Sequence, residues 1–239
     1  GKSTLIDLIL GLIKPTKGDI FVDGLILNEN LKPWQKLIGY VPQDIYLLDD
    51  TIKNNIAFGL NTNDINQEEI LKSIESSRLK DYVSSLEKKE NTVIGNRGIR
   101  VSGGQKQRIG IARALYHGPR ILILDEATSS LDTINERIIM EEIYNTAENI
   151  TLIIVTHRHK SVSRCDKVYL LDNGKIIDEG KYSDLEKRHS FWFIAKAYLN
   201  LFKERGSLKP LQLPRFWLYM KKEMETQKII ITGGATRIG

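Results

Sequence analysis

The sequence has a single cysteine, no long apolar run and no large excess of one charge. Cys165 has no second cysteine to pair with, which excludes an internal disulfide and suits a reducing compartment. Continuous apolar runs such as ILIL at 121–124 are far shorter than the roughly 20 residues that a membrane-spanning helix needs. The 35 Lys and Arg residues are dispersed and balanced by 30 Asp and Glu residues, so we expect no nucleic-acid partner.

What the sequence does contain is the composition of a globular domain, with 41% hydrophobic and 27% charged residues among 239. Two apolar runs, RILILDE and ITLIIVTHR, end abruptly in polar residues, as parallel strands covered on both faces do. The stretch LIGYVPQD predicts a further strand that stops at Pro42, and residues from about 50 to 117 are mostly helical in pattern. This pattern predicts an α/β core whose ligands bind beyond the carboxyl ends of the strands.

Two motifs suggest an anion site. The first residues, GKST, match the end of the phosphate-binding pattern G-x-x-x-x-G-K-[ST], although so short a match also fits an ordinary helix start. In VSGGQ, Ser102 is a suitable N-cap, and the two glycines that follow let another group approach the backbone. The start of a helix offers N–H groups and a positive dipole end to an anion.

A third motif supplies carboxylates. The apolar run ILIL delivers Asp125 and Glu126 into a polar turn. A carboxylate at the first position can hold Mg²⁺ in P-loop proteins, and one at the second can accept a proton from an attacking water molecule.

Because these motifs occur in order, residues 1–200 resemble the nucleotide-binding domain of ABC transporters. The resemblance identifies a Q-loop in YVPQD, the signature in VSGGQ, a D-loop in SSLD and the switch histidine in VTHR. It implies an α/β fold of the P-loop NTPase (RecA-like) type, with a parallel-sheet core, a helical subdomain inserted at about 50–118, and the N-terminal strands lacking.

The resemblance also implies ATP and Mg²⁺ as cofactors and gives the residues roles. Glu126 is expected to be the general base and His157 to hold the γ-phosphate, with Lys2 and Gln43 also catalytic. Ser3, Gln43 and Asp125 are the expected Mg²⁺ ligands. The expected nucleotide-binding residues are Gly1, Lys2, Ser3, Thr4, Ser102, Gly103, Gly104, Gln105 and Asp132.

The resemblance implies partners as well: a second ATPase domain packed head to tail, and a transmembrane domain. The segments DDTIKNNIAFG and TVIGNRGIRVSGGQ look like those of bacterial exporters, which places the domain at the cytoplasmic face of the inner membrane. Lipids and lipid-linked saccharides are the cargo that this type brings to mind. A soluble mechanical ABC ATPase is a rival interpretation, disfavoured because about 100 residues without sustained heptads separate the first motif from the signature.

Both ends of the chain lead to further expectations. The resemblance implies that strands and the first part of the P-loop precede Gly1, so we expect residues 1–239 alone to bind ATP poorly and to hydrolyse it negligibly. Residues 201–226 are predicted to be a linker or tail. Residues 227–239, which include KIIITGGATRIG, resemble the first strand and cofactor loop of short-chain dehydrogenase/reductases, or form a plain Gly-rich strand and turn. Two further functions therefore stay open at this point, an NADP-dependent oxidoreductase and an ATP sensor that does not hydrolyse its ligand.

Overall fold

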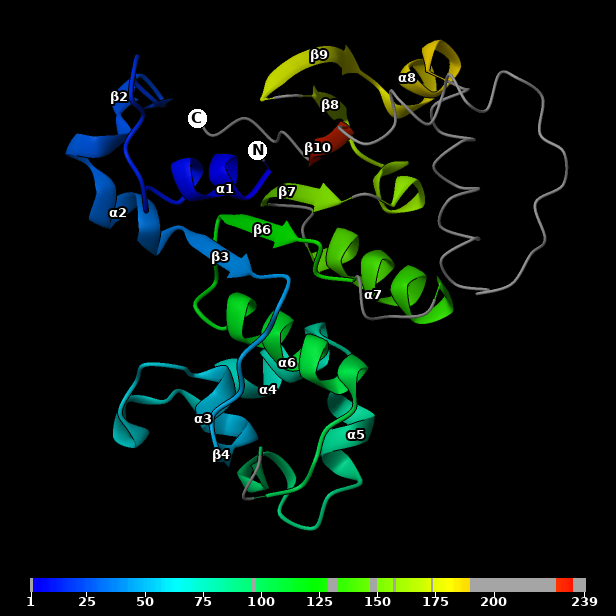
Figure 1. The fold of residues 1–239 in the computed structure, drawn as a ribbon. Coiled ribbons are helices and arrows are strands. Elements are labelled where there is room, and N and C mark those ends of the chain that lie inside the picture. The colour runs from blue at the N-terminus through cyan, green and yellow to red at the C-terminus, as the bar shows by residue number, and fades with distance from the viewer. Residues whose placement is uncertain are drawn as a thin grey trace, which may run out of the picture. The chain divides into compact units, whose positions relative to one another are not determined.

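The computed structural model describes residues 2–95, 98–128, 133–146, 150–156, 158–172, 174–189 and 227–233 (Figure 1). Most of these residues fall into two compact units. The larger unit includes residues 3–155, and the smaller unit includes residues 156–233.

Strands of the larger unit pair in parallel in the order β3–β6–β7. The first four residues of β6 are each at most 4% exposed, so this strand is covered on both faces, as its apolar run predicts. Strand β3 stops directly before Pro42, which has no N–H group to continue the pairing. The predicted α/β core is confirmed. The bounds are β3 (Ile38–Val41), β6 (Ile121–Asp125) and β7 (Thr151–Thr156).

Helix α1 (Lys2–Ile9) begins at the GKST motif, and its far end is closed by α2 (Leu31–Lys36). Trp34 Nε1 donates a hydrogen bond to the Ile9 carbonyl (2.7 Å), and Gln35 Nε2 donates one to the Leu10 carbonyl (3.0 Å). These side chains satisfy carbonyl groups that have no partner within the helix. The end of α1 is therefore fixed by contacts made within the first 36 residues. A short antiparallel hairpin of β1 (Phe21–Val22) and β2 (Leu25–Ile26), followed by η1 (Leu27–Glu29), lies between the two helices.

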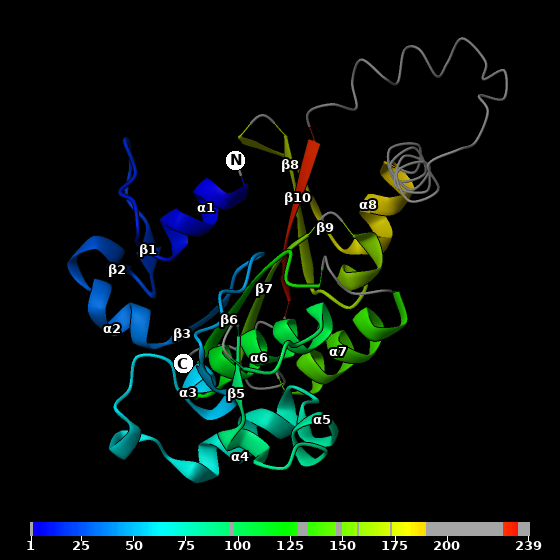
Figure 2. The same cartoon turned by 60° about the horizontal axis from the view of Figure 1, so that its bottom comes forward.

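Residues 50–118, called the helical region below, form a layer of short helices with its own hydrophobic core (Figures 1 and 2). Helix α4 is capped at its start by Asn66, whose side chain accepts hydrogen bonds from the backbone N–H groups of Glu68 and Glu69. Two-residue strands β4 and β5 pair antiparallel within this otherwise helical segment. The elements are β4 (Asp50–Thr51), α3 (Ile52–Ile56), η2 (Thr62–Asp64), α4 (Gln67–Ser76), α5 (Lys80–Ser84), η3 (Lys89–Asn91), β5 (Val93–Ile94) and α6 (Gly103–Leu115).

Helix α7 (Thr133–Thr146) follows β6 in the chain and belongs to the larger unit. Its buried face carries Ile139, Met140 and Ile143.

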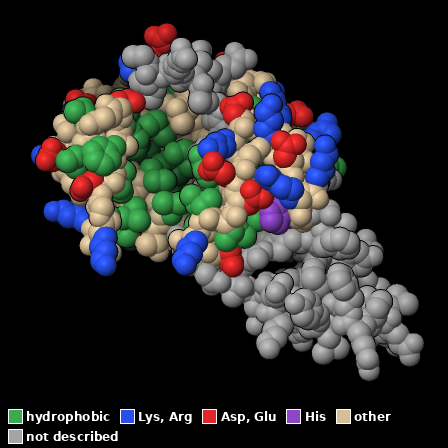
Figure 3. Space-filling model, turned by 90° about the horizontal axis from the view of Figure 1, so that it is seen from above, with side chains coloured by type: hydrophobic (Ala, Val, Ile, Leu, Met, Phe, Trp, Pro, Cys, Tyr) green, Lys and Arg blue, Asp and Glu red, His purple; other side chains and the backbone are tan. Residues whose placement is uncertain are grey.

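The face of the molecule seen in Figure 3 carries hydrophobic side chains at its surface. In the larger unit, the exposed large hydrophobic residues around α1 and the β1–β2 hairpin are Leu12, Ile13, Phe21 and Leu25.

In the smaller unit, β8 pairs antiparallel with β9 on one side and with β10 on the other. Figures 1 and 2 both show β10, which belongs to the C-terminal segment, beside β8. Asp178 of β9 binds the end of α8 through His189 Nε2 (2.7 Å) and Arg188 Nη2 (3.2 Å). The bounds are η5 (His159–Val162), β8 (Lys167–Asp172), β9 (Lys175–Gly180), α8 (Tyr182–Arg188) and β10 (Gln227–Gly233). Among the described residues, no helix is both long enough and apolar enough to cross a membrane.

Candidate functional site

The carboxylates that the sequence singles out lie at the carboxyl end of β6. Asp125 is the last residue of the strand, and Glu126 follows it; both are half-buried. Glu126 has a φ of +48°, a left-handed conformation that is uncommon for residues other than glycine, and its N–H donates to the Val155 carbonyl on β7 (2.7 Å). Backbone strain of this kind persists only where the surrounding structure holds the residue in place, and it is found most often at functional sites. The turn therefore fixes the backbone position from which the Glu126 side chain extends.

Gln43 reaches the same edge of the sheet from a neighbouring strand. Because Val41 on β3 pairs in parallel with Leu124 on β6, the residues that follow the two strands emerge at the same edge. Gln43 is exposed. The structure thus brings the Q-loop glutamine and the two carboxylates to one end of the β3–β6 pair, as the sequence predicts for a ligand site.

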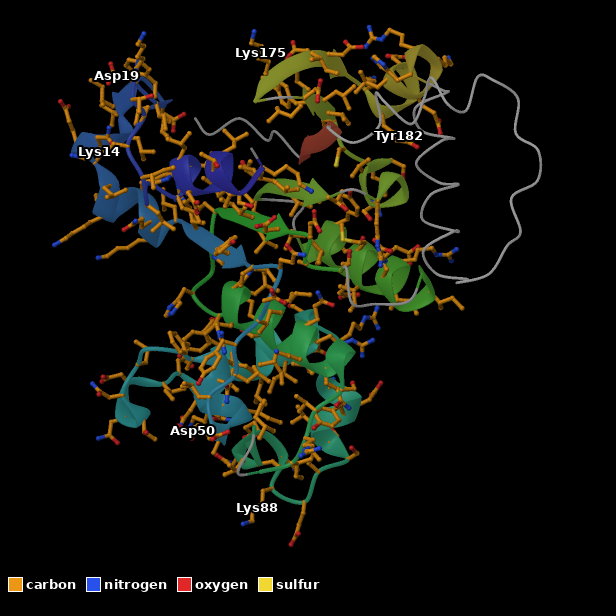
Figure 4. The ribbon with its side chains drawn as sticks, in the orientation of Figure 1. Lys14, Asp19, Asp50, Lys88, Lys175 and Tyr182 are labelled. Atoms are coloured by element: carbon orange, nitrogen blue, oxygen red, sulfur yellow. The ribbon has the colours of Figure 1, made fainter. Side chains whose placement is uncertain are left out.

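The loop after Gln43 is held by Asn55, which is fully buried. The Asn55 amide accepts a hydrogen bond from the Leu48 N–H (2.8 Å) and donates to the carbonyls of Leu48 (3.1 Å) and Thr51 (3.0 Å). Arg113 of α6 in turn donates to the Asn55 carbonyl (2.8 Å). Asp50, labelled in Figure 4, accepts a hydrogen bond from Asn54 (2.8 Å) at the same corner. A single buried amide therefore determines the path of this loop.

Ile45 in that loop also rests on the signature helix. It is 5% exposed and lies against Gly110 of α6, where an added Cβ would collide with the Ile45 side chain. Gly39 of β3 permits a similar approach, because a Cβ there would collide with the Ala114 carbonyl of α6. Helix α6 consequently packs directly on the strand and on the loop that carry Gln43.

The signature residues form the start of α6. Ser102 Oγ accepts a hydrogen bond from the Gln105 N–H (3.2 Å), and Gln105 Oε1 accepts one from the Ser102 N–H (2.7 Å). This reciprocal pair is a capping box, and it confirms the N-cap that the sequence predicts at Ser102. Gly103 and Gly104 form the first turn, where backbone N–H groups have no carbonyl partner within the helix. Such a turn is suited to binding a phosphate.

At the first motif, Lys2, Ser3 and Thr4 open α1. Lys2 is 9% exposed, whereas Ser3 and Thr4 are exposed. The predicted site residues Gly1, Asp132 and His157 lie outside the described residues, so their roles remain predictions.

The donor set suits Mg²⁺. Mg²⁺ prefers oxygen ligands, keeps several waters and is held in nucleotide sites by one or two carboxylates together with phosphate oxygens. Asp125 with the Ser3 hydroxyl fits that requirement. Within the described ranges, no group of three or more His, Cys, Asp or Glu side chains is arranged to hold a metal by protein ligands alone.

The sequence does not single out Tyr40, whose hydroxyl donates to Asp125 Oδ2 at 3.5 Å. The pKa of Tyr40 is raised to about 12 by burial, and by the charges of Asp125 and Asp7. Nor does the sequence predict the buried hydrogen bond from Thr128 Oγ1 to Glu136 Oε1 of α7 (3.0 Å). The sequence does contain a signal for Tyr40, because a polar residue in a strand next to the one that ends in Asp125 can lie beside that carboxylate. Using this signal requires knowing that β3 pairs with β6.

Comparison with known proteins gives a family match and named relatives. A family model described as "ABC transporter" matches residues 1–129. The heterocyst differentiation ATP-binding protein HepA of Nostoc sp. is 39% identical over 194 residues, which are 80% of this chain and 32% of that protein. The ATP-dependent lipid A-core flippase of Francisella novicida is 38% identical over 77% of this chain and 31% of its own length.

Two further proteins extend the comparison. A multidrug resistance ABC transporter ATP-binding and permease protein of Lactococcus lactis is 35% identical over 80% of this chain and 32% of its own length. The solved structure of a bacterial Atm1-family ABC exporter with ATP bound matches with a TM-score of 0.75 and 32% identity, over 84% of this chain and 35% of that one. The chain spans about a third of the length of the curated relatives it matches.

Proposed function

This chain belongs to the ABC transporter family, and from that premise we propose that it is the ATP-hydrolysing domain of a bacterial exporter. The similar solved structure, which is named an ABC exporter, supports export as the direction of movement. The observation that carries the proposal is the end of β6, where Asp125 and the strained Glu126 meet the edge that also carries Gln43.

In this proposal each motif keeps the role that the sequence predicts. Lys2, Ser3 and Thr4, with Gly1 before them, bind the phosphates of ATP through the start of α1. Ser3, Asp125 and Gln43 hold Mg²⁺, which when bound neutralises charge on the phosphate oxygens. Glu126 accepts the proton of the attacking water, and its turn orients the carboxylate before the substrate arrives. His157 holds the γ-phosphate.

The signature residues Ser102, Gly103, Gly104 and Gln105 are proposed to bind the ATP of a second copy, packed head to tail, with Asp132 at the same interface. The start of α6 supports this role: the capping box pairs Ser102 with Gln105 and fixes the first turn, whose Gly103 and Gly104 N–H groups lie outside the box and suit an anion. Closing of the dimer on ATP and its opening after hydrolysis would drive a transmembrane domain at the cytoplasmic face of the inner membrane. Lipids or lipid-linked saccharides are the proposed cargo.

The domain division also remains a proposal: an ATPase domain over residues 1–200 with a helical subdomain at about 50–118, a linker or tail over 201–226, and a truncated Rossmann-like first strand with a Gly-rich turn over 227–239. Strand β10 does not add support for a reductase. Its pairing with β8 is antiparallel, whereas the first strand of a dinucleotide-binding fold lies in a parallel sheet.

The substitution Glu126→Gln tests the proposal in the intact protein that contains this chain. Loss of the general base should lower the rate of ATP hydrolysis at least about a hundredfold, with ATP binding retained. The matched control is Glu141→Gln, which changes an exposed carboxylate on α7 that pairs with Arg137 one turn away, and it should hydrolyse ATP at the wild-type rate. If the wild-type protein binds ATP without hydrolysing it, and Glu126→Gln does not change its ATP binding, the protein is an ATP sensor instead.

A further inference from the structure

Tyr40 is placed beside the carboxylate of Asp125 by the pairing of two strands. It lies on β3 opposite Ile123 of β6, two residues before Asp125. Since side chains alternate along a strand, Ile123 and Asp125 lie on one face of β6, and Tyr40 shares that face. The Tyr40 hydroxyl approaches Asp125 Oδ2 at 3.5 Å, and the ring is half-buried.

A second carboxylate, Asp7 of α1, lies near the same phenol. Its negative charge and that of Asp125 add to burial in raising the pKa of Tyr40 to about 12. A tyrosine hydroxyl is ordinarily protonated at neutral pH, so Tyr40 acts as a donor toward a carboxylate.

We propose that Tyr40 is a positioning residue for Asp125: its hydroxyl holds the carboxylate in the orientation that binds the Mg²⁺ of MgATP. This inference rests on the function proposed above. A carboxylate at a strand end has a fixed backbone but two side-chain torsions, and a donor directed at Oδ2 selects among their rotamers. Hydrogen bonds in such sites are often long before the reactant complex forms, and a movement of about half an ångström would bring this one into the usual range.

The test compares Tyr40→Phe with wild type in the intact protein, and uses Tyr82→Phe as the matched control. Tyr82 is also a half-buried tyrosine, but its hydroxyl has no hydrogen-bond partner among the described residues. Both substitutions remove a single oxygen atom. The readouts are the Mg²⁺ concentration that gives half-maximal ATPase activity, and the affinity for Mn²⁺ in the presence of ATP, measured by electron paramagnetic resonance.

Tyr40→Phe should raise both the half-maximal Mg²⁺ concentration and the Mn²⁺ dissociation constant by about three- to tenfold, because a hydrogen bond to a charged group is lost. Binding of ATP in EDTA and the melting temperature should stay at wild-type values, which a merely structural role would not predict. In an Asp125→Asn background, Tyr40→Phe should have no further effect on Mn²⁺ affinity. Tyr82→Phe should change none of these quantities.

The outcomes separate this inference from the proposed function. If the wild type hydrolyses ATP and Tyr40→Phe has the same metal dependence as the wild type, the role of Tyr40 is overturned and the ATPase assignment stays intact. If wild type binds Mn²⁺ with ATP but shows no turnover, the ATPase proposal fails, and the Mn²⁺ affinity of Tyr40→Phe still decides the role of Tyr40. A wild-type protein that binds no Mn²⁺ with ATP would overturn both.

Discussion

Within the larger unit, the helical region and the part built on α1 and the β1–β2 hairpin bury their hydrophobic residues to different degrees. The helical region encloses a core in which Ile52, Ile56, Ile70 and Ile109 are fully buried, and its most exposed large hydrophobic residue is Leu71, at 52%. Around α1 and the hairpin, by contrast, Leu12 remains 64% exposed and Phe21 remains 61% exposed.

The candidate site draws on the helical region and on the parallel sheet of the larger unit. The carboxylates come from the end of β6, whereas the signature is the first turn of α6, a helix whose buried face belongs to the helical core. A region with its own core can shift as one body without unfolding. The position of the signature relative to the carboxylates is therefore set by the contacts of α6 with β3 and with the loop after Gln43.

The largest expected effect comes from breaking the helical core. Ile109→Ala should destabilise the helical region by about 2–5 kcal/mol, since Ile109 is fully buried on α6. Hydrogen exchange of the intact protein would show faster exchange in peptides from residues 50–118. Leu71→Ala is the control, because Leu71 on α4 is 52% exposed and its truncation should change exchange little. Equal acceleration in β3 and β6 would mean that the helical region has no independent core.

A smaller effect is expected at a contact between the helical region and α7. Arg78 precedes α5, with a left-handed φ of +55°, and its Nη2 lies 2.6 Å from Glu142 Oε2 of α7. Its carbonyl also accepts a hydrogen bond from Arg108 of α6 (3.1 Å). Because the Arg78 side chain is 58% exposed, solvent screening limits the pair to about 0.2–1 kcal/mol.

A double-mutant cycle with Arg78→Ala and Glu142→Ala, followed by thermal unfolding at low and high salt, measures this coupling. The exposed pair Lys80–Glu75 (2.7 Å) lies wholly within the helical region and serves as the comparison. The Arg78–Glu142 substitutions should also change the ATPase rate, because this ion pair joins the helical region to α7. The Lys80–Glu75 substitutions should not change it. Identical effects of the two cycles on activity would remove Arg78 as a link between the helical region and α7.

Much of the fold follows from local sequence patterns. The buried strands at 121–125 and 151–156, the stop of β3 before Pro42 and the cap at Ser102 are all predictable, because each depends on residues close together in the chain. The turn sequence DNG at 172–174 is a strong hairpin signal, so the pairing of β8 with β9 also has a local origin.

The rest of the candidate site depends on tertiary contacts that no local pattern contains. The hydrogen bond between Tyr40 and Asp125 joins residues 85 positions apart, and it exists only because β3 pairs with β6. Asn55 reads in the sequence as an ordinary polar helix residue, yet it is fully buried and organises the loop after Gln43. The left-handed conformation of Glu126 likewise results from packing, since glutamate has no preference for it.

The central claim is that the signature of one copy completes the nucleotide site of another, and cross-linking tests it most directly. Thr4→Cys and Gly103→Cys are combined with Glu126→Gln in the intact protein, and a short bifunctional maleimide is added with and without MgATP. Ser85→Cys, at an exposed position in the helical region, replaces Gly103→Cys in the control. The native Cys165 is buried and should react slowly.

MgATP should promote a cross-link between two copies that carry the Thr4→Cys and Gly103→Cys pair, and should leave the Ser85→Cys control uncross-linked. A yield that does not respond to MgATP, or that equals the control, would contradict the account.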